Sequence, residues 1–358
     1  MEIDSIFRRA EEFKERSLFP ESLKLFKKAL KGYSKTGDDE KILQCLLFLG
    51  DIHRMVGDFG RAIRKYLEAL KIAEGQKDII KTADARVGLG LSLRAEGRWK
   101  EAIKLFAESS RTYQKKGDTE GLAFTLWAKA GSLRIKGDII KAIETFRESH
   151  RMFKSMEHVP GIGYSLCGLG GTSRIAGRFK DSLRYYTAAN KLFSHIRDKF
   201  GIAYSFCGIG NAQRMKGDYG NAIENFRKAT RLYQAIGDKV SYSYTLWSLG
   251  ATYKMLGKYK RSEDYYKKAM QFFRRTKDPR GIIYCRLGLG EIDLLKKRNI
   301  DAGRQFKAAL LESTLKDFAL EKCHAKVFIN YLNGKIDDRC YNRLGLRLGF
   351  QRLPFNVP

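Results

Sequence analysis

The sequence is poor in the residues that interrupt helices or build catalytic and metal sites. Of 358 residues, five are proline and five are histidine, and no Ser/Pro-rich or low-complexity stretch separates one part from another. This excludes a flexible linker, so we expect one continuous array without a domain boundary. The histidines (53, 150, 158, 195 and 324) do not recur in a common frame, and no Ser/His/Asp or Cys/His arrangement can be argued. We therefore expect no catalytic site, no metal and no cofactor.

Long apolar runs and paired cysteines are also missing. No run reaches the roughly 18 apolar residues that a membrane-spanning helix needs, and residues 1–17 are charged throughout, unlike a secretory signal. The six cysteines show no Cys-x-x-Cys spacing and fall mostly in apolar positions, which favours buried free thiols over disulfides or zinc ligands. Both observations lead us to expect a soluble, cytoplasmic protein.

Acidic residues are too few to balance the basic ones. The chain has 69 Lys and Arg against 40 Asp and Glu, a net charge of +29, of which residues 1–78 contribute only +2. A field of this sign attracts polyanions: acidic protein segments, nucleic acid or anionic lipid. Many of these charges can equally form a solvated outer face that keeps a long helical array soluble.

What the sequence has is a 40-residue repeat that does not slip between about residue 37 and residue 317. The phrase that ends each unit recurs at Gly37-Asp38, Lys77-Asp78, Gly117-Asp118, Glu157-His158, Arg197-Asp198, Gly237-Asp238 and Lys277-Asp278. Apolar residues recur at three- and four-residue spacing on both sides of a central glycine, so each unit predicts two helices joined by a left-handed turn. The turn glycines are Gly57, Gly97, Gly137, Gly177, Gly217 and Gly257. A fixed period of this length indicates a stacked solenoid, in which each unit packs only on its neighbours.

Small and aromatic residues recur at fixed places in both helices. A Leu/Ile-Gly pair in the first helix ends at Gly50, Gly90, Gly170, Gly210, Gly250 and Gly290, where close approach of the second helix outweighs the cost of mid-helix glycine. In the second helix, a small residue, an aromatic and another small residue follow in order, as in Ala222, Phe226 and Ala229. The aromatics are expected to form the core.

This constellation resembles the tetratricopeptide repeat (TPR) family, although 40 residues exceed its usual period of 34. The resemblance implies an all-α, right-handed α-α superhelix of about eight helix-turn-helix repeats plus a C-terminal cap. Similar long repeats occur in polarity and spindle-orientation adaptors and in bacterial peptide-sensing regulators, which bind extended peptides in a concave groove. We expect a single solenoid over residues 1–334, followed by a cap or docking tail over 335–358. Its repeats would span residues 1–38, 39–78, 79–118, 119–158, 159–198, 199–238, 239–278 and 279–318, with a partial repeat over 319–334.

One column of the groove face implied by the resemblance is cationic in successive repeats. Its members are Lys14, Arg54, Arg94, Arg134, Arg174, Arg214 and Lys254, and the series ends at Leu294. A cation in the last turn of a helix is favoured by the helix dipole, but five consecutive arginines favour a grip on carboxylates or phosphates. We call these residues the cation ladder, and we expect Arg54 to Lys254 to bind a partner.

Two neighbouring columns complete the predicted surface. Three residues before the ladder, the groove floor is small in the middle and acidic at both ends, and Asn211 offers a side-chain amide. Nearer the helix start lie Phe124, Tyr164, Tyr204 and Tyr244, which can serve either as core residues or as a platform for a ligand.

These columns predict a non-enzymatic scaffold that binds an extended acidic segment of a partner protein in a basic groove. The alternative is a solenoid that binds single-stranded RNA or DNA, since basic grooves with aromatics also hold nucleic acid. The apolar residues of the C-terminal segment (Leu344, Leu346, Leu348, Phe350, Leu353 and Phe355) suggest either a cap over the last repeat or a docking peptide for a partner or a second copy. The oligomeric state does not follow from the sequence.

Overall fold

The computed structural model describes residues 2–346, 348 and 352–358, so Phe350 of the predicted apolar pattern lies outside the described residues. In this part of the chain there are eighteen α-helices and no strand. The first eight are α1 (Glu2–Glu15), α2 (Phe19–Thr36), α3 (Asp39–Met55), α4 (Phe59–Gly75), α5 (Ile79–Ala95), α6 (Trp99–Lys116), α7 (Thr119–Lys136) and α8 (Ile139–Ser155). The next eight are α9 (Val159–Ile175), α10 (Phe179–His195), α11 (Lys199–Met215), α12 (Tyr219–Ile236), α13 (Lys239–Met255), α14 (Tyr259–Thr276), α15 (Pro279–Leu295) and α16 (Asn299–Leu315). The last two are α17 (Ala319–Leu332) and the short α18 (Arg339–Arg343).

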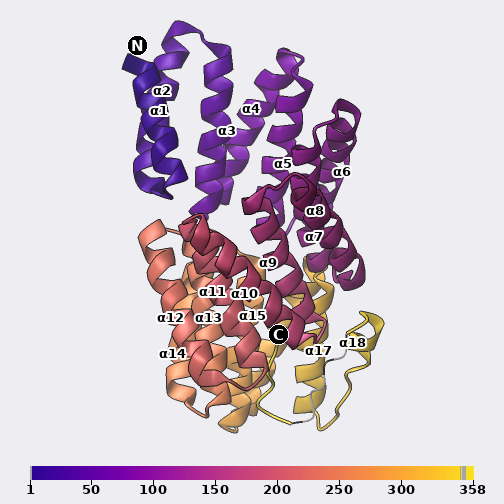
Figure 1. Cartoon of the computed structure of the whole chain (residues 1–358). Coiled ribbons are helices and arrows are strands. Elements are labelled where there is room, and N and C mark those ends of the chain that lie inside the picture. The colour runs from indigo at the N-terminus through magenta and orange to yellow at the C-terminus, as the bar shows by residue number, and fades with distance from the viewer. Residues whose placement is uncertain (1, 347, 349–351) are drawn as a thin grey trace.

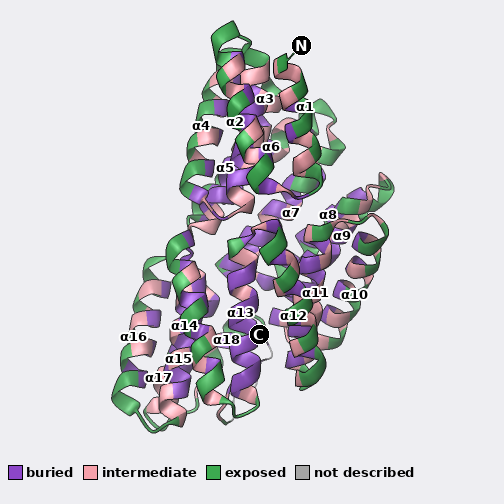
Figure 2. Ribbon diagram, turned by 90° about the vertical axis from the view of Figure 1, so that its left-hand side faces the viewer, coloured by how far each residue is buried: buried purple, intermediate pink, exposed green. Residues whose placement is uncertain are grey.

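Consecutive helices pack as pairs, and the pairs stack into a superhelix (Figure 1). The odd-numbered helices also contact one another, as α9 does α11 and α13 does α15, which places them on the inner side. Figure 2 shows the consequence: α13 and α15 are buried along most of their length, whereas α10 and α16 carry exposed residues. The predicted all-α fold of stacked helix pairs is confirmed.

The turn within each repeat follows from two short sequence signals. At the end of α11, Gly217 adopts φ 84°, a left-handed conformation that glycine reaches without steric cost. Asp218 then caps α12, because its side chain accepts a hydrogen bond from the Asn221 N–H at 3.4 Å. All six predicted turn glycines have positive φ, so this prediction is confirmed.

Glycine and aromatic residues fit together in the core between repeats. A Cβ atom at Gly250 would lie 2.8 Å from the ring of Tyr266 in the same repeat, and one at Gly288 would lie 2.5 Å from the same ring from the next repeat. The ring is therefore held between two helices that can approach only because both positions lack a side chain. Tyr266 is fully buried, as the repeat pattern predicts.

The glycine–aromatic contact predicts a stability effect at Gly210. A Cβ atom there would lie 2.7 Å from Phe226 and 3.1 Å from the Ala222 carbonyl oxygen. Because the backbone carbonyl cannot move aside, we expect Gly210→Ala to destabilise the fold by about 1–3 kcal/mol in urea unfolding. Gly220→Ala is the matched control, since no atom lies within 4 Å of a Cβ there, and it should be neutral or slightly stabilising. Equal effects of the two substitutions would contradict the close packing.

Successive turns of the superhelix touch each other, contrary to the expectation that each repeat packs only on its neighbours. The indole Nε1 of Trp99 donates a hydrogen bond to the Lys316 carbonyl at 3.2 Å, across 217 residues, and Lys100 pairs with Asp317 at 2.8 Å. In Figure 1, α17 accordingly lies beside α7, and the two are in contact. A separation of 217 residues is between five and six repeats, so about that many repeats make one turn of the coil.

One prediction about the cysteines is wrong. Cys323 in α17 and Cys340 in α18 form a disulfide, with their Cα atoms 5.7 Å apart, while Cys45, Cys167, Cys207 and Cys285 are free thiols. The pairing joins two elements whose proximity depends on how the chain turns after α17, which local spacing does not encode. The bond ties residue 340, and the segment that follows it, to the last repeat.

No helix among the described residues is long and apolar enough to span a bilayer.

A buried histidine beside this disulfide predicts a pH dependence of stability. Burial lowers the pKa of His324 to about 4, against an ordinary value near 6.5. As the pH falls below 6.5, His324 binds a proton in the unfolded chain but stays neutral in the folded chain. The free energy of unfolding therefore falls between about pH 6.5 and pH 4. The effect of this residue at pH 5 should be about 2 kcal/mol relative to pH 8.

The measurement is chemical unfolding from pH 8 to pH 5, for the wild type and for His324→Gln. Buried carboxyls such as Asp238, whose pKa burial raises to about 6, act in the opposite direction but are common to both proteins. The difference between the two curves isolates the histidine, and parallel curves would contradict its assignment as a buried neutral group.

Candidate binding groove

The cation ladder lies in the last turn of successive inner helices, from α1 to α13. Its members nevertheless divide into two groups. Lys14, Arg54, Arg94, Arg134 and Arg174 are partly exposed. Arg214 and Lys254 are 0% and 2% exposed. The same sequence position therefore has two environments.

The small residues of the groove floor make room for the ladder side chains. A Cβ atom at Gly171 would lie 2.8 Å from Arg134 Nη1 of the preceding repeat, and one at Gly131 would overlap Arg94 Nη1. In the groove, each of these arginines lies across the next repeat's glycine. The middle of the floor, which the sequence predicts to be lined by small residues, is covered by guanidinium groups at Gly131 and Gly171.

The upper part of the groove, at Arg54, Arg94, Arg134 and Arg174, concentrates positive charge. Burial, together with the nearby charges of Arg134 and Arg54, lowers the pKa of Arg94 to about 9. Arg54 is partly compensated by Asp51, whose carboxylate lies 3.3 Å from its Nη2. Among the described residues, Arg94, Arg134 and Arg174 have no carboxylate partner, and Arg174 Nε and Nη1 are buried without a hydrogen bond. These three arginines form a cationic surface, in which Arg94 Nη1 donates to the Ala128 carbonyl at 2.9 Å and the unused bonding capacity is that of Arg174.

The predicted aromatic residues differ in their exposure and in whether their polar groups are already bonded within the chain. Phe124 is 40% exposed and stacks on Trp127, with ring centroids 5.5 Å apart. The hydroxyl of Tyr164 donates to Asp198 at 2.7 Å, so it is used within the chain.

Tyr204 and Tyr244 are half-buried on the same side. Tyr204 stacks on Phe200, and burial raises its pKa while the positive charges of Arg134 and Arg94 oppose the rise. Tyr244 packs against Phe273 at 4.7 Å. Of the four predicted aromatics, Phe124 is the most exposed, while Tyr164 and Tyr244 are held by contacts within their own repeats, to Asp198 and Phe273.

Asn211 serves the ladder instead of facing an empty groove. Its Oδ1 accepts hydrogen bonds from the Ser248 hydroxyl at 3.1 Å and from Arg214 Nη2 at 3.4 Å, and its Nδ2 donates to the Cys207 carbonyl at 3.1 Å. These bonds hold the Arg214 guanidinium in position.

The lower part of the groove, at Arg214 and Lys254, contains the chain's own segment 352–358. Lys254 Nζ donates to the Phe355 carbonyl at 2.6 Å and also pairs with Glu291. The Phe355 N–H donates to the other carboxylate oxygen of Glu291. Arg214 Nη2 donates to the Val357 carbonyl at 2.9 Å. Two side chains from neighbouring repeats therefore satisfy both main-chain groups of one residue, Phe355.

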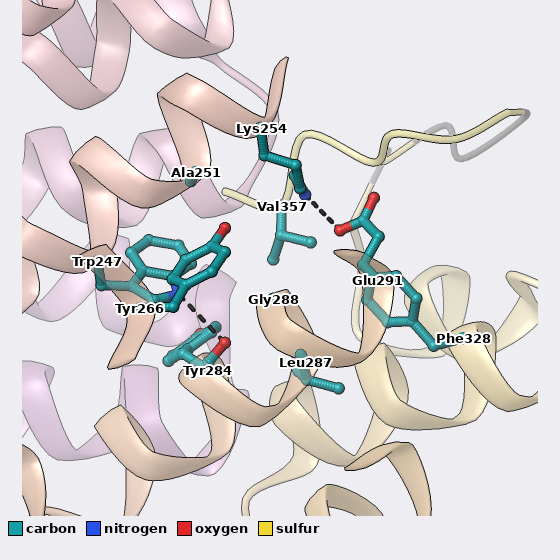
Figure 3. A pocket seen from close by; sticks show the side chains of 10 residues that line it. All are labelled: Trp247, Ala251, Lys254, Tyr266, Tyr284, Leu287, Gly288, Glu291, Phe328 and Val357. Atoms are coloured by element: carbon teal, nitrogen blue, oxygen red, sulfur yellow. Dashed lines mark hydrogen bonds and ion pairs between the residues drawn. The ribbon is translucent and has the colours of Figure 1, made fainter. Parts of the chain in front are cut away.

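Side chains of the segment fill apolar space between the inner helices. Phe355 packs against Phe328 and Tyr331 of α17, each with ring centroids 5.2 Å away. Val357 forms one wall of a pocket whose other walls include Trp247, Tyr284 and Leu287 (Figure 3). The space left in this pocket is about 10 Å³, room for no more than one water molecule.

Burial sets the electrostatics of the Lys254–Glu291 pair. Burial lowers the pKa of Lys254 and raises that of Glu291, and each partner's charge opposes the shift of the other. The two groups face each other and the segment, as Figure 3 shows. Glu291 belongs to the acidic end of the groove floor that the sequence predicts, whereas Phe328 and Tyr331, in α17, lie outside the predicted columns. The alternation of apolar residues near the end of the chain pointed to their partner, Phe355.

The described residues contain no group of three or more His, Cys, Asp or Glu side chains that could hold a metal ion.

Family comparisons give consistent matches along the chain. Three models, each described as tetratricopeptide repeat, match residues 9–75 and 81–155, residues 203–236, and residues 245–276, which together cover more than half of the sequence. No curated protein matches the sequence significantly.

Several solved structures share the fold at low sequence identity. A Rap protein complexed with Competence and Sporulation Factor is 14% identical, with a TM-score of 0.63 and coverage of 96% of this chain and 98% of the other. The Rap conjugation gene regulator of plasmid pLS20, in complex with the Phr* peptide, is 13% identical, with a TM-score of 0.65 and coverage of 87% and 96%. Aspartyl phosphate phosphatase F from Bacillus subtilis is 14% identical, with a TM-score of 0.52 and coverage of 98% and 97%. At these identities the likeness shows the fold alone.

Proposed function

The chain belongs to the tetratricopeptide repeat family, and from this premise we propose that it is a non-enzymatic scaffold that binds an extended acidic segment of a partner protein in its inner groove. A protein-interaction role is supported by the fold. Two of the solved structures that resemble it are complexes, one with Competence and Sporulation Factor and one with the Phr* peptide.

The observation that carries the acidic specificity is the state of Arg94, Arg134 and Arg174. They lie on one column in consecutive repeats, and within the described residues none has a carboxylate partner. Arginine's planar fork binds carboxylates in two places, and such bonds are strong in a partly buried site. Carboxylates of a bound segment would pair with the partly exposed guanidinium groups of these three arginines.

The overall charge favours the same class of partner. A net charge of +29 attracts an acidic segment from solution and accelerates its encounter with the groove. Phe124, which stacks on the Trp127 ring that Arg94 also contacts, and the half-buried Tyr204 offer apolar contact to residues that alternate with the acidic ones. One named structural neighbour is a phosphatase, but its likeness extends only to the fold, and the proposal assigns no catalytic residue.

The test is recovery of protein partners on the wild type and on Arg94→Gln/Arg134→Gln/Arg174→Gln. The proposal expects partner recovery to fall at least about 100-fold in the variant, since each charge-assisted bond is worth about 1.5–3 kcal/mol. The matched control is Arg111→Gln/Arg151→Gln/Arg231→Gln, which removes the same charge from exposed positions of the outer helices.

Two results would overturn the proposal. If partner recovery falls equally in the groove variant and in the outer control, the loss comes from the lower net charge and not from the groove. Disappearance of the partners after nuclease treatment would assign the groove to nucleic acid instead.

A further inference from the structure

We propose that residues 352–358 are a tethered ligand of the groove, which a partner segment of similar pattern must displace to reach Arg214, Lys254 and Glu291. This inference rests on the proposed function in that it describes the regulation of the same groove. The experiment below uses the segment's own sequence as the peptide and changes residues of the segment instead of the arginines. The proposed function and this inference can therefore fail separately.

The contacts of the segment are those of a bound peptide. Glu291 accepts the Phe355 N–H, Lys254 donates to the Phe355 carbonyl at 2.6 Å, and Arg214 donates to the Val357 carbonyl at 2.9 Å. All three bonds go to main-chain groups. They therefore hold any extended chain that enters the groove, and the side chains between them supply the selectivity.

The register of these contacts matches the repeat. Residues 355 and 357 meet Lys254 and Arg214, which lie one repeat apart, so the segment advances two residues per repeat and runs from the later repeat to the earlier one. Two extended residues span about 6.6 Å, which is therefore the distance that the segment advances per repeat. The next ladder position is Arg174, which has two buried nitrogens without a hydrogen bond in the described part of the chain. The segment thus occupies the last positions of a ladder that continues unfilled beyond it.

The side chains define the class of competing ligand. Phe355 packs against Phe328 and Tyr331, and Val357 closes the pocket beside Trp247. Between them, the Asn356 side chain accepts from Arg214 Nη1 and donates to the Arg214 carbonyl at 3.0 Å. The pattern is aromatic, polar acceptor, aliphatic. Aspartate at the middle position would meet Arg214 with a full charge, which makes a segment of alternating acidic and apolar residues the natural competitor.

The covalent attachment of the segment raises its local concentration. The Cys323–Cys340 disulfide fixes residue 340 to α17, whose Phe328 and Tyr331 form part of the site. A ligand on a short tether acts at an effective concentration of about millimolar. A free peptide of moderate affinity is therefore excluded from the intact site, while an acidic competitor with additional contacts along the ladder can enter.

The experiment measures binding of a fluorescein-labelled synthetic peptide, Arg-Leu-Pro-Phe-Asn-Val-Pro, by fluorescence anisotropy. The full chain should bind it at least about 10-fold more weakly than a chain lacking residues 352–358 and than the full-length variant Phe355→Ala/Val357→Ala, in which the segment has lost both apolar anchors. Arg352→Ala is the matched control, because this residue of the segment is exposed, and it should behave as the wild type.

A second change in the segment completes the test. Asn356→Leu in the full chain should raise peptide binding, since the segment then loses its acceptor for Arg214 Nη1 and its donor to the Arg214 carbonyl. Equal peptide affinity for the full chain and for Phe355→Ala/Val357→Ala would overturn the inference. So would failure of the deleted chain to bind the peptide while its circular dichroism spectrum shows it to be folded. Because the point variant keeps the whole segment, its result stands even if the deleted chain does not fold.

Discussion

Glu291→Ala is expected to lower the free energy of unfolding by about 3–5 kcal/mol, one of the largest effects of any single substitution in this chain. Glu291 and Lys254 are both almost fully buried and paired with each other. Removing the carboxylate leaves a buried ammonium group without its partner and the Phe355 N–H without its acceptor. Urea unfolding followed by circular dichroism measures the loss as a shift of the midpoint.

The double variant Lys254→Met/Glu291→Leu is the control for this prediction. Replacing both members of a buried pair with apolar residues of similar size removes the cost of burying the charges, so it should be far less destabilising than Glu291→Ala alone. If the single variant is as stable as the double one, Lys254 is not held as a buried charge, and the account of the lower groove is wrong.

The second large effect is expected in the upper groove. Arg134→Glu/Arg174→Glu should weaken the binding of a synthetic decapeptide, in which Asp alternates with Val and Phe, by at least about 1,000-fold, because two attractions become repulsions in a partly buried site. Isothermal titration calorimetry measures the affinity. For the wild type, that affinity should also fall with added salt, as expected for exposed charges.

The control keeps the change of net charge and moves it to the outer helices. Arg111→Glu/Arg151→Glu alters two exposed positions and should change the affinity by less than about 10-fold. A similar loss in both variants would mean that the peptide responds to the field of the whole molecule and not to the groove.

Much of the fold could be predicted from the sequence because the determinants are local and repeated. Gly217 marks the turn, and its φ of 84° is one that few other residues adopt. The spacing between Gly210 and Phe226 encodes a contact within one repeat, and the structure has it. Each such feature occurs several times, so chance agreement at one position matters little.

What could not be predicted depends on contacts between distant parts of the chain. The Trp99–Lys316 contact arises from the curvature of the whole coil, to which every repeat adds a small rotation. The Cys323–Cys340 disulfide depends on where the chain turns after α17.

The candidate site shows the same division. The ladder was found because its members share one position per repeat, yet the sequence could not show that Arg214 and Lys254 are buried, since their covering comes from residues 355–357, outside the periodic region. The binding role of the remaining residues, Arg54 to Arg174 with Phe124 and Tyr204, stays a prediction.

Selection of random 12-residue peptides displayed on phage tests the central claim most directly, with the wild type and Arg94→Gln/Arg134→Gln/Arg174→Gln as parallel baits. The account predicts that the wild type enriches peptides in which Asp or Glu alternates with aromatic and aliphatic residues, and that the variant does not retain them. Enrichment of neutral or basic peptides, or of the same acidic peptides on both baits, would contradict it.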